Sequence, residues 1–124
     1  MRLLLDPHVL LWCLMDSGLS QYTRDTIADP ANEVAVSAAS AWEISIKKAL
    51  NKLSAPDDLE SQIQASGFVA LPIQISHAWA AGALPRHHDD PFDRLLIAQA
   101  GIEGFTIVTR DNRFADYAVS LMPA

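Results

Sequence analysis

Short apolar runs alternate along the chain with stretches in which apolar residues recur at helical spacing. The runs predict strands at 3–5, 33–36, 68–71 and 105–109, and a last short strand at 118–121. The helices predicted between them run over 7–14, 20–28, 38–50, 54–66, 76–84 and 90–101, and a helical turn follows at 113–116. This order favours an α/β fold, a sandwich of helices around a mainly parallel central sheet.

One predicted helix carries an apolar stripe. Trp42, Ile46 and Leu50 are spaced four residues apart, so we expect them to share the face that packs on the sheet. Asp-Pro pairs are predicted to begin two other helices, at Asp6-Pro7 and Asp90-Pro91, because proline suits the first helical position.

Composition limits the class of protein. The 124 residues are 50% hydrophobic, which suits one domain over 1–124 with its own core. The single cysteine, Cys13, forms neither an internal disulfide nor a cysteine zinc cluster and is expected to pack in the core. Asp6-Pro7-His8 interrupts the apolar N-terminus, and no run approaches the length of a membrane span, so we expect a cytoplasmic protein without membrane contact.

Several acidic residues fall where strands end or helices begin. Asp6 and Asp111 follow two predicted strands, and the carboxyl ends of parallel strands are where ligands gather. Asp90 and Asp93 lie three residues apart at a helix start, so both can approach one point. Carboxylates that converge in this way suit Mg²⁺ or Mn²⁺ rather than zinc, and such a metal can activate water for attack at phosphorus.

Each acid also has a purely structural interpretation. Asp6, Asp90 and Asp111 suit helix caps or turns, and Asp93 suits the positive end of its helix. Ser40 and Glu43 fit a capping box, and Glu43 stands four residues before Lys47, as in an ordinary surface ion pair.

The remaining polar and aromatic residues give weaker signals. His87 and His88 lie in a polar loop and are expected to be solvated, His8 to be half-buried, and His77 to lie near a helix start; no zinc spacing is present. The three tryptophans are expected in the core or at an interface: Trp12, Trp42 and Trp79. There is no Walker-type loop, G-x-G-x-x-G or G-x-S-x-G motif.

Four segments together resemble the PIN-domain ribonucleases, specifically toxins of the VapC type. They are Leu3-Leu4-Leu5-Asp6 with the helix after it, Ser37–Ile44, His88–Ala100 with its Asp-Asp-Pro-Phe-Asp-Arg run, and Val108-Thr109-Arg110-Asp111 followed by Phe114 and Tyr117. They extend nearly from one end of the chain to the other, and their order makes the joint match specific.

The resemblance implies a three-layer α/β/α sandwich and a Mg²⁺- or Mn²⁺-dependent endoribonuclease. By position, Asp6, Glu43, Asp93 and Asp111 would be the catalytic acids and metal ligands, and Asp90 would support them or share a ligand role. It also implies a prokaryotic toxin with an RNA substrate and a cognate VapB-type antitoxin, and that the chain forms a homodimer. The position after the first acid, usually threonine in this subgroup, is Pro7, which lacks the hydroxyl and the backbone donor.

The charge of −6, from 15 acidic and 9 basic residues, at first argues against a nucleic-acid partner. If four of the acids are metal ligands, removing their formal charge gives −6 + 4 = −2. Arg94 and Arg110, each beside a proposed site acid, are the preferred contacts for the RNA backbone. Other candidate contacts are Lys47, Lys48, Arg86 and Arg113, while Lys52 is expected to be solvated surface.

Two other functions stay open. An aspartyl-phosphate phosphatase would use Asp6 as the nucleophile, but it requires a second aspartate where His8 stands and a lysine where Arg110 is a poor substitute. A catalytically impaired PIN-like module that binds antitoxin or RNA without cutting is favoured only by Pro7.

Overall fold

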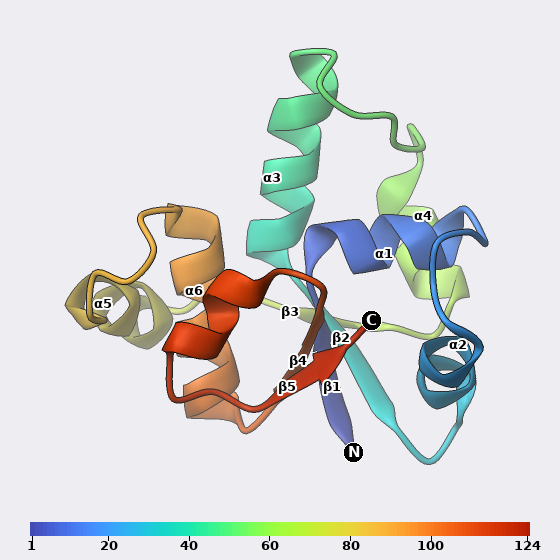
Figure 1. Ribbon diagram of the computed structural model, residues 1–124. Helices are drawn as coiled ribbons and strands as arrows, with labels where there is room; N and C mark the ends of the chain where they lie inside the picture. Colours follow the sequence, from blue (N-terminus) through green and yellow to red (C-terminus); the bar gives the residue numbers. More distant parts are fainter.

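Five parallel strands form the centre of the molecule (Figure 1). The computed structural model describes residues 1–124, and the strands lie in the order β3-β2-β1-β4-β5. They are β1 (Arg2–Leu5), β2 (Glu33–Ser37), β3 (Val69–Leu71), β4 (Thr106–Thr109) and β5 (Leu121–Pro123). Every neighbouring pair is parallel, so the carboxyl ends of all five strands share one edge of the sheet.

Helices cover both faces of this sheet, which confirms the predicted three-layer α/β/α sandwich (Figure 1). They are α1 (Pro7–Leu14), α2 (Gln21–Ala28), α3 (Ala38–Ala49), α4 (Leu59–Ala65), α5 (Ile75–Ala83) and α6 (Pro91–Glu103), with a 3₁₀ helix η1 (Asn112–Asp116). None of these helices has the length and apolar character needed to cross a bilayer.

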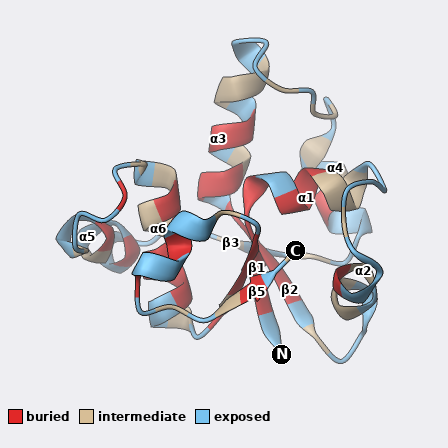
Figure 2. Cartoon of the chain, in the orientation of Figure 1, coloured by how far each residue is buried: buried red, intermediate tan, exposed pale blue.

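The central strand β1 is buried on both sides (Figure 2). Leu3 and Leu5 point into a core shared with α1, α3 and α4, whereas Leu4 points to the opposite face and packs with α6. Side chains of a strand alternate between its two faces, so a run of three leucines is what a strand between two helical layers requires.

The Asp-Pro pairs begin helices as predicted. Asp6 caps α1, because its Oδ1 accepts the Val9 N–H at 2.8 Å, and Pro7 occupies the first turn. Asp90 caps α6 in the same way through the N–H groups of Phe92 and Asp93. Both carboxylates are thereby fixed at the edge where the strands end.

The prediction that an apolar stripe of α3 packs on the sheet is wrong. Trp42 and Leu50 are 60% and 58% exposed, and Ile46 is only half-buried. The buried face of α3 instead consists of small or polar residues with one isoleucine: Ala39, Ser40, Glu43 and Ile44. Close packing of the first turn against β2 and α6 requires small residues there, so the larger apolar side chains lie outside.

Most boundaries agree with the prediction to within two residues, and two differ by more. The last strand is β5 at Leu121–Pro123 rather than 118–121, and α4 begins at Leu59 rather than near residue 54. Cys13 is half-buried against the core, and burial raises the pKa of its thiol to about 11, which keeps it protonated.

Candidate metal-dependent active site

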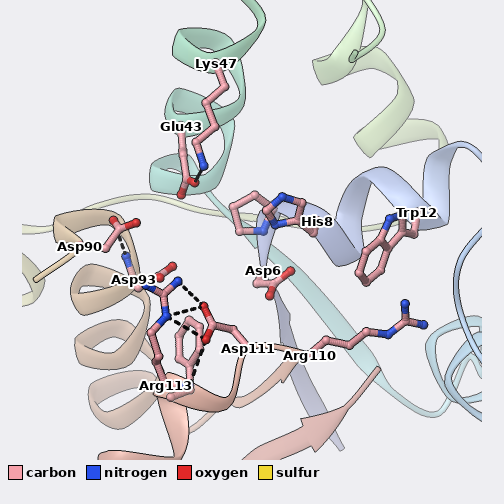
Figure 3. Close-up of a pocket in the computed structure, with 12 residues that line it drawn as sticks. Asp6, His8, Trp12, Glu43, Lys47, Asp90, Asp93, Arg110, Asp111 and Arg113 are labelled. Carbon is pink, nitrogen blue, oxygen red and sulfur yellow. Dashed lines mark hydrogen bonds and ion pairs between the residues drawn. The ribbon is translucent and has the colours of Figure 1, made fainter. Parts of the chain in front are cut away.

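An open pocket of about 120 Å³ lies where the strands β1, β2 and β4 end (Figure 3). All five acids singled out from the sequence line it: Asp6, Glu43, Asp90, Asp93 and Asp111. Three cationic side chains line it as well: Lys47, Arg110 and Arg113. The fold thus brings together carboxylates separated by up to 105 positions of sequence (111 − 6 = 105).

Asp6 lies at the end of the central strand and is buried. Its Oδ1 caps α1, and its Oδ2 accepts a hydrogen bond from the Thr109 hydroxyl at the end of β4. Burial raises the pKa of Asp6, while these two hydrogen bonds act in the opposite direction. The carboxylate is therefore held in one orientation by a backbone N–H of α1 and a side-chain hydroxyl at the end of β4.

Glu43 projects from α3 into the pocket and is only 5% exposed. Ser37, not Ser40, caps α3, so Glu43 lies in the second turn and forms no capping box. Its Oε2 pairs with Lys47 Nζ at 2.6 Å, and this contact raises the pKa of Lys47. Its Oε1 has no hydrogen-bond partner although it is buried.

Asp90 caps α6, and Asp93 lies in its first turn. Asp93 is 8% exposed, and burial together with the nearby charge of Asp90 raises the pKa of Asp93 to about 6. One oxygen of Asp93, Oδ2, contacts His88 Nε2 at 2.7 Å. The accumulation of negative charge at this corner is costly without a counter-charge.

Asp111 follows β4 and caps η1. The guanidinium of Arg113 contacts both of its carboxylate oxygens, at 3.0 Å for Nε–Oδ1 and 2.7 Å for Nη2–Oδ2 (Figure 3). This ion pair lowers the pKa of Asp111. Arg113 is mostly exposed, so the pair is a local surface contact at the mouth of the pocket.

The five acids do not all converge on one point. Glu43, Asp90 and Asp93 each offer an oxygen, and these atoms lie within 4.8 Å of one another. A second group shares Asp93 and consists of His88, Asp93 and Asp111. Asp6 lines the same pocket but belongs to neither group.

His88 and Thr109 are the contributors that sequence reasoning missed. The expectation of a solvated His88 is wrong, because the residue is 5% exposed and bonded to Asp93. Thr109 is buried and orients Asp6. Thr109 stands two residues before Asp111, and both Thr109 and His88 fall in segments that resemble the family, which was the only signal for either residue.

Arg94 and Arg110 were expected to contact the RNA backbone because each stands beside a proposed site acid in the sequence. The structure places neither guanidinium as that expectation requires. Successive residues of a helix point about 100° apart, so Arg94 faces α5 while Asp93 faces the pocket. The Arg94 guanidinium donates to backbone carbonyls of residues 81, 82, 84, 85 and 88, and it does not line the pocket. Arg110 does line it, but its guanidinium stacks on the Trp12 ring at 4.3 Å and donates to Gly18 O and Ala124 O.

His77 lies in the first turn of α5, as predicted, and is fully buried. His8 is exposed rather than half-buried. Trp42 and Trp79 are 60% and 83% exposed, so neither is a core residue.

The donor set fits a divalent cation. The Glu43–Asp90–Asp93 group consists of carboxylates only, and the Oε1 of Glu43 is buried without a hydrogen-bond partner. A buried carboxylate oxygen without a donor is costly, and an oxygen-preferring ion such as Mg²⁺ or Mn²⁺ would satisfy it.

Solved structures of the same shape come from bacterial toxin–antitoxin systems. VapBC2 from Rickettsia felis bound to a DNA fragment from its promoter aligns with a TM-score of 0.74 and 17% identity, over 100% of this chain and 99% of that one. DNA-bound VapBC from Salmonella typhimurium aligns with a TM-score of 0.71 and 15% identity, over 99% of this chain and 98% of that one. A toxin–antitoxin complex from Klebsiella pneumoniae aligns with a TM-score of 0.67 and 20% identity, over 96% of this chain and 94% of that one.

No curated protein matches the chain in sequence. The model of one family, the PIN domain, matches residues 3–120, which is nearly the whole chain. Together with the parallel sheet and the acidic pocket at its edge, this match shows that the chain belongs to the PIN-domain family.

Proposed function

We propose that this PIN domain is a Mg²⁺- or Mn²⁺-dependent endoribonuclease and the toxin of a toxin–antitoxin pair. PIN domains are generally nucleases. The observation that carries the proposal is the Glu43 carboxylate: its Oε1 is buried without a hydrogen-bond partner, and one of its oxygens lies within 4.8 Å of oxygens from Asp90 and Asp93.

Glu43, Asp90 and Asp93 would hold the cation, and Asp6 and Asp111 would line the rest of the reaction site. When bound, the cation supplies positive charge that stabilises a phosphodiester under attack and lowers the pKa of a bound water. The reaction needs no histidine or serine nucleophile, because water is the attacking group.

The side chains around these acids prepare the site. Lys47 balances the charge of Glu43, and Thr109 fixes the Asp6 carboxylate so that it can orient the attacking water. Arg113 is exposed at the pocket mouth and paired only with Asp111, so it is the cation best placed to donate to an incoming phosphate. Arg113, rather than Arg94, is therefore the preferred contact for the RNA backbone.

Cleavage of RNA by the purified protein tests the proposal. We expect cleavage of single-stranded RNA in Mg²⁺ or Mn²⁺, none after chelation, and recovery when metal is restored. Glu43→Gln and Asp93→Asn should each lower the rate at least 100-fold, because each removes one charged oxygen from the proposed cation group. Asp116→Asn, an exposed carboxylate in η1 that does not line the pocket, is the matched control and should keep the wild-type rate.

Cleavage that persists in chelator, or that both pocket variants retain, would contradict this assignment. The competing function is a PIN-like module that binds RNA or antitoxin without cutting. Pro7 still favours it, because this buried first residue of α1 brings no hydroxyl to the pocket that it lines. Metal binding without cleavage of any RNA would support that function instead.

The partners are proposed on separate grounds. An antitoxin is suggested by the similar structures, which are themselves toxin–antitoxin complexes. A homodimer is suggested by α5, where Ile75 and Trp79 are 87% and 83% exposed one helical turn apart. Exposed apolar side chains of this size commonly mark protein–protein contacts.

A further inference from the structure

His88 is a buried histidine in a loop that is otherwise polar and mostly exposed. It precedes α6 and is 5% exposed, whereas His87 beside it is exposed. Its ring lies edge-on to Phe114, a residue that lines the acidic pocket. The loop therefore delivers one imidazole to the wall of the site.

The hydrogen bonds of His88 define how its ring is protonated. Nδ1 accepts the backbone N–H of Asp90 at 3.3 Å, so Nδ1 carries no proton. The proton of the neutral ring then lies on Nε2, which donates to Asp93 Oδ2 at 2.7 Å. Both ring nitrogens are thus occupied, and neither presents a lone pair to a cation.

This arrangement separates the two candidate groups of ligands. In the group of His88, Asp93 and Asp111, the histidine is a hydrogen-bond donor rather than a ligand. Asp93 accepts from His88 through Oδ2, and the same carboxylate offers an oxygen to the Glu43–Asp90–Asp93 group. The hydrogen bond from His88 therefore constrains the orientation of the Asp93 carboxylate in the pocket that it lines.

The loop that carries His88 is itself held from several directions. The His88 backbone N–H donates to the Tyr117 hydroxyl at 3.0 Å, and that hydroxyl donates to Pro85 O at 2.7 Å. Arg94 donates to Pro85 O at 2.9 Å and to His88 O at 3.3 Å. These contacts hold the backbone of the loop, and with it His88, in place before α6 begins.

We propose that His88 is a positioning residue that orients the Asp93 carboxylate for cation binding through its Nε2–H. The proposal rests on the cation site of the proposed function. The contacts that Arg94 and Tyr117 make with the loop support this one hydrogen bond. Donors of this kind commonly change metal affinity 10- to 100-fold when removed.

Mn²⁺ titration of the RNA-free protein, followed by calorimetry, tests the role. His88→Leu removes the donor and should weaken Mn²⁺ binding by about 10- to 100-fold. His88→Gln keeps an N–H near the position of Nε2 and should recover most of that loss. His87→Phe removes an exposed imidazole of the same loop but keeps an aromatic ring against Tyr117, so it is the matched control and should bind Mn²⁺ like wild type.

A second readout uses the wild-type protein alone. Long-range ¹H–¹⁵N spectra of the chelated protein should show the His88 proton on Nε2. A proton on Nδ1 would overturn the proposal, and this test can be made even if His88→Leu does not fold.

The remaining outcomes are also decisive. Equal loss of Mn²⁺ affinity in His88→Leu and His88→Gln would mean a merely structural histidine, and unchanged affinity in His88→Leu would remove the role altogether. Wild-type protein that binds Mn²⁺ but cuts no RNA would refute the nuclease and leave the role of His88 standing. Wild-type protein that binds no Mn²⁺ would overturn both.

Discussion

Three of the pocket aspartates serve at once as helix caps and as walls of the site. Asp6, Asp90 and Asp111 each direct one oxygen, Oδ1, to backbone N–H groups at a helix start. A carboxylate has two oxygens and about four acceptor positions, so capping leaves capacity for another contact. The structural and the functional interpretations of these residues are therefore compatible, and the cap fixes the side chain for its second role.

The raised pKa of Asp93 gives the metal-free protein a distinctive pH dependence. The unfolded pKa is about 4 and the folded value about 6, so the folded state binds this proton more tightly. The stability that this binding contributes is complete below pH 4 and is lost as the pH rises through 6. At pH 7.5 in chelator, Asp93→Asn should therefore raise the free energy of unfolding by about 1–3 kcal/mol.

Urea unfolding in chelator at pH 5 and pH 7.5 measures this effect. The gain from Asp93→Asn should shrink at pH 5 and reverse in saturating Mn²⁺, where the charged carboxylate is stabilised. Asp116→Asn should change little under any of these conditions. If Asp93→Asn is less stable than wild type at pH 7.5 in chelator, the claim that the charged Asp93 carboxylate destabilises the metal-free fold is wrong.

At the scale of elements, Arg94 joins α6 to the end of α5 and to the loop between them. Its donors reach Ala81 O and Leu84 O at 2.8 and 2.9 Å, in addition to Pro85 O and His88 O. The last carbonyls of a helix lack partners within the helix, and a cation favours the negative end of its dipole. One side chain thus caps α5 and holds the loop that leads to α6.

Replacing Arg94 should therefore destabilise the fold rather than only weaken RNA binding. Arg94→Gln removes several hydrogen bonds from a charged donor and should lower the free energy of unfolding by about 2–4 kcal/mol. Arg86→Gln, an exposed arginine of the same loop, should cost less than about 0.5 kcal/mol. Chemical denaturation measures both, and equal stability of the two variants would show that the Arg94 contacts carry little energy.

The order of the elements was readable from the sequence, because buried strands and capped helices leave strong local patterns. The triple leucine of β1 and the two Asp-Pro starts are examples. The pattern failed where tertiary context decides. Trp42 fits an apolar stripe but is exposed, because the buried face of α3 carries Glu43 instead.

The same limit applies to the candidate site. All five acids named from the sequence line the pocket, since parallel strands bring their carboxyl ends to one edge. His88 was missed because a loop carries no periodicity that reports burial. Arg94 was misplaced because neighbours in a helix sequence are not neighbours on a helix face.

For the whole molecule, the negative charge and the exposed apolar surface bear on its partners. Of the nine basic residues, those lining the pocket are engaged by carboxylates or by an aromatic ring: Lys47 with Glu43, Arg113 with Asp111, and Arg110 with Trp12. Protein charge alone therefore offers RNA little attraction without a cation, so we expect RNA binding to weaken strongly in chelator.

The homodimer is expected to use the exposed face of α5. Trp79→Ser removes a side chain that is 83% exposed, so it should leave the fold intact while weakening dimerisation at least 10-fold. Sedimentation velocity across a range of concentrations measures this. Tyr22→Ser, which removes a 71% exposed aromatic from α2, is the control and should not change the dimer. A wild-type protein that stays monomeric would contradict this assignment.

The central claim is that Glu43, Asp90 and Asp93 form one cation site at the end of the parallel sheet. Anomalous diffraction from a crystal grown with Mn²⁺ tests it most directly. We expect a Mn²⁺ peak in contact with these three carboxylates, including Glu43 Oε1, and its loss in Glu43→Gln. A pocket without a peak at saturating Mn²⁺, or a peak that Glu43 does not contact, would contradict the claim.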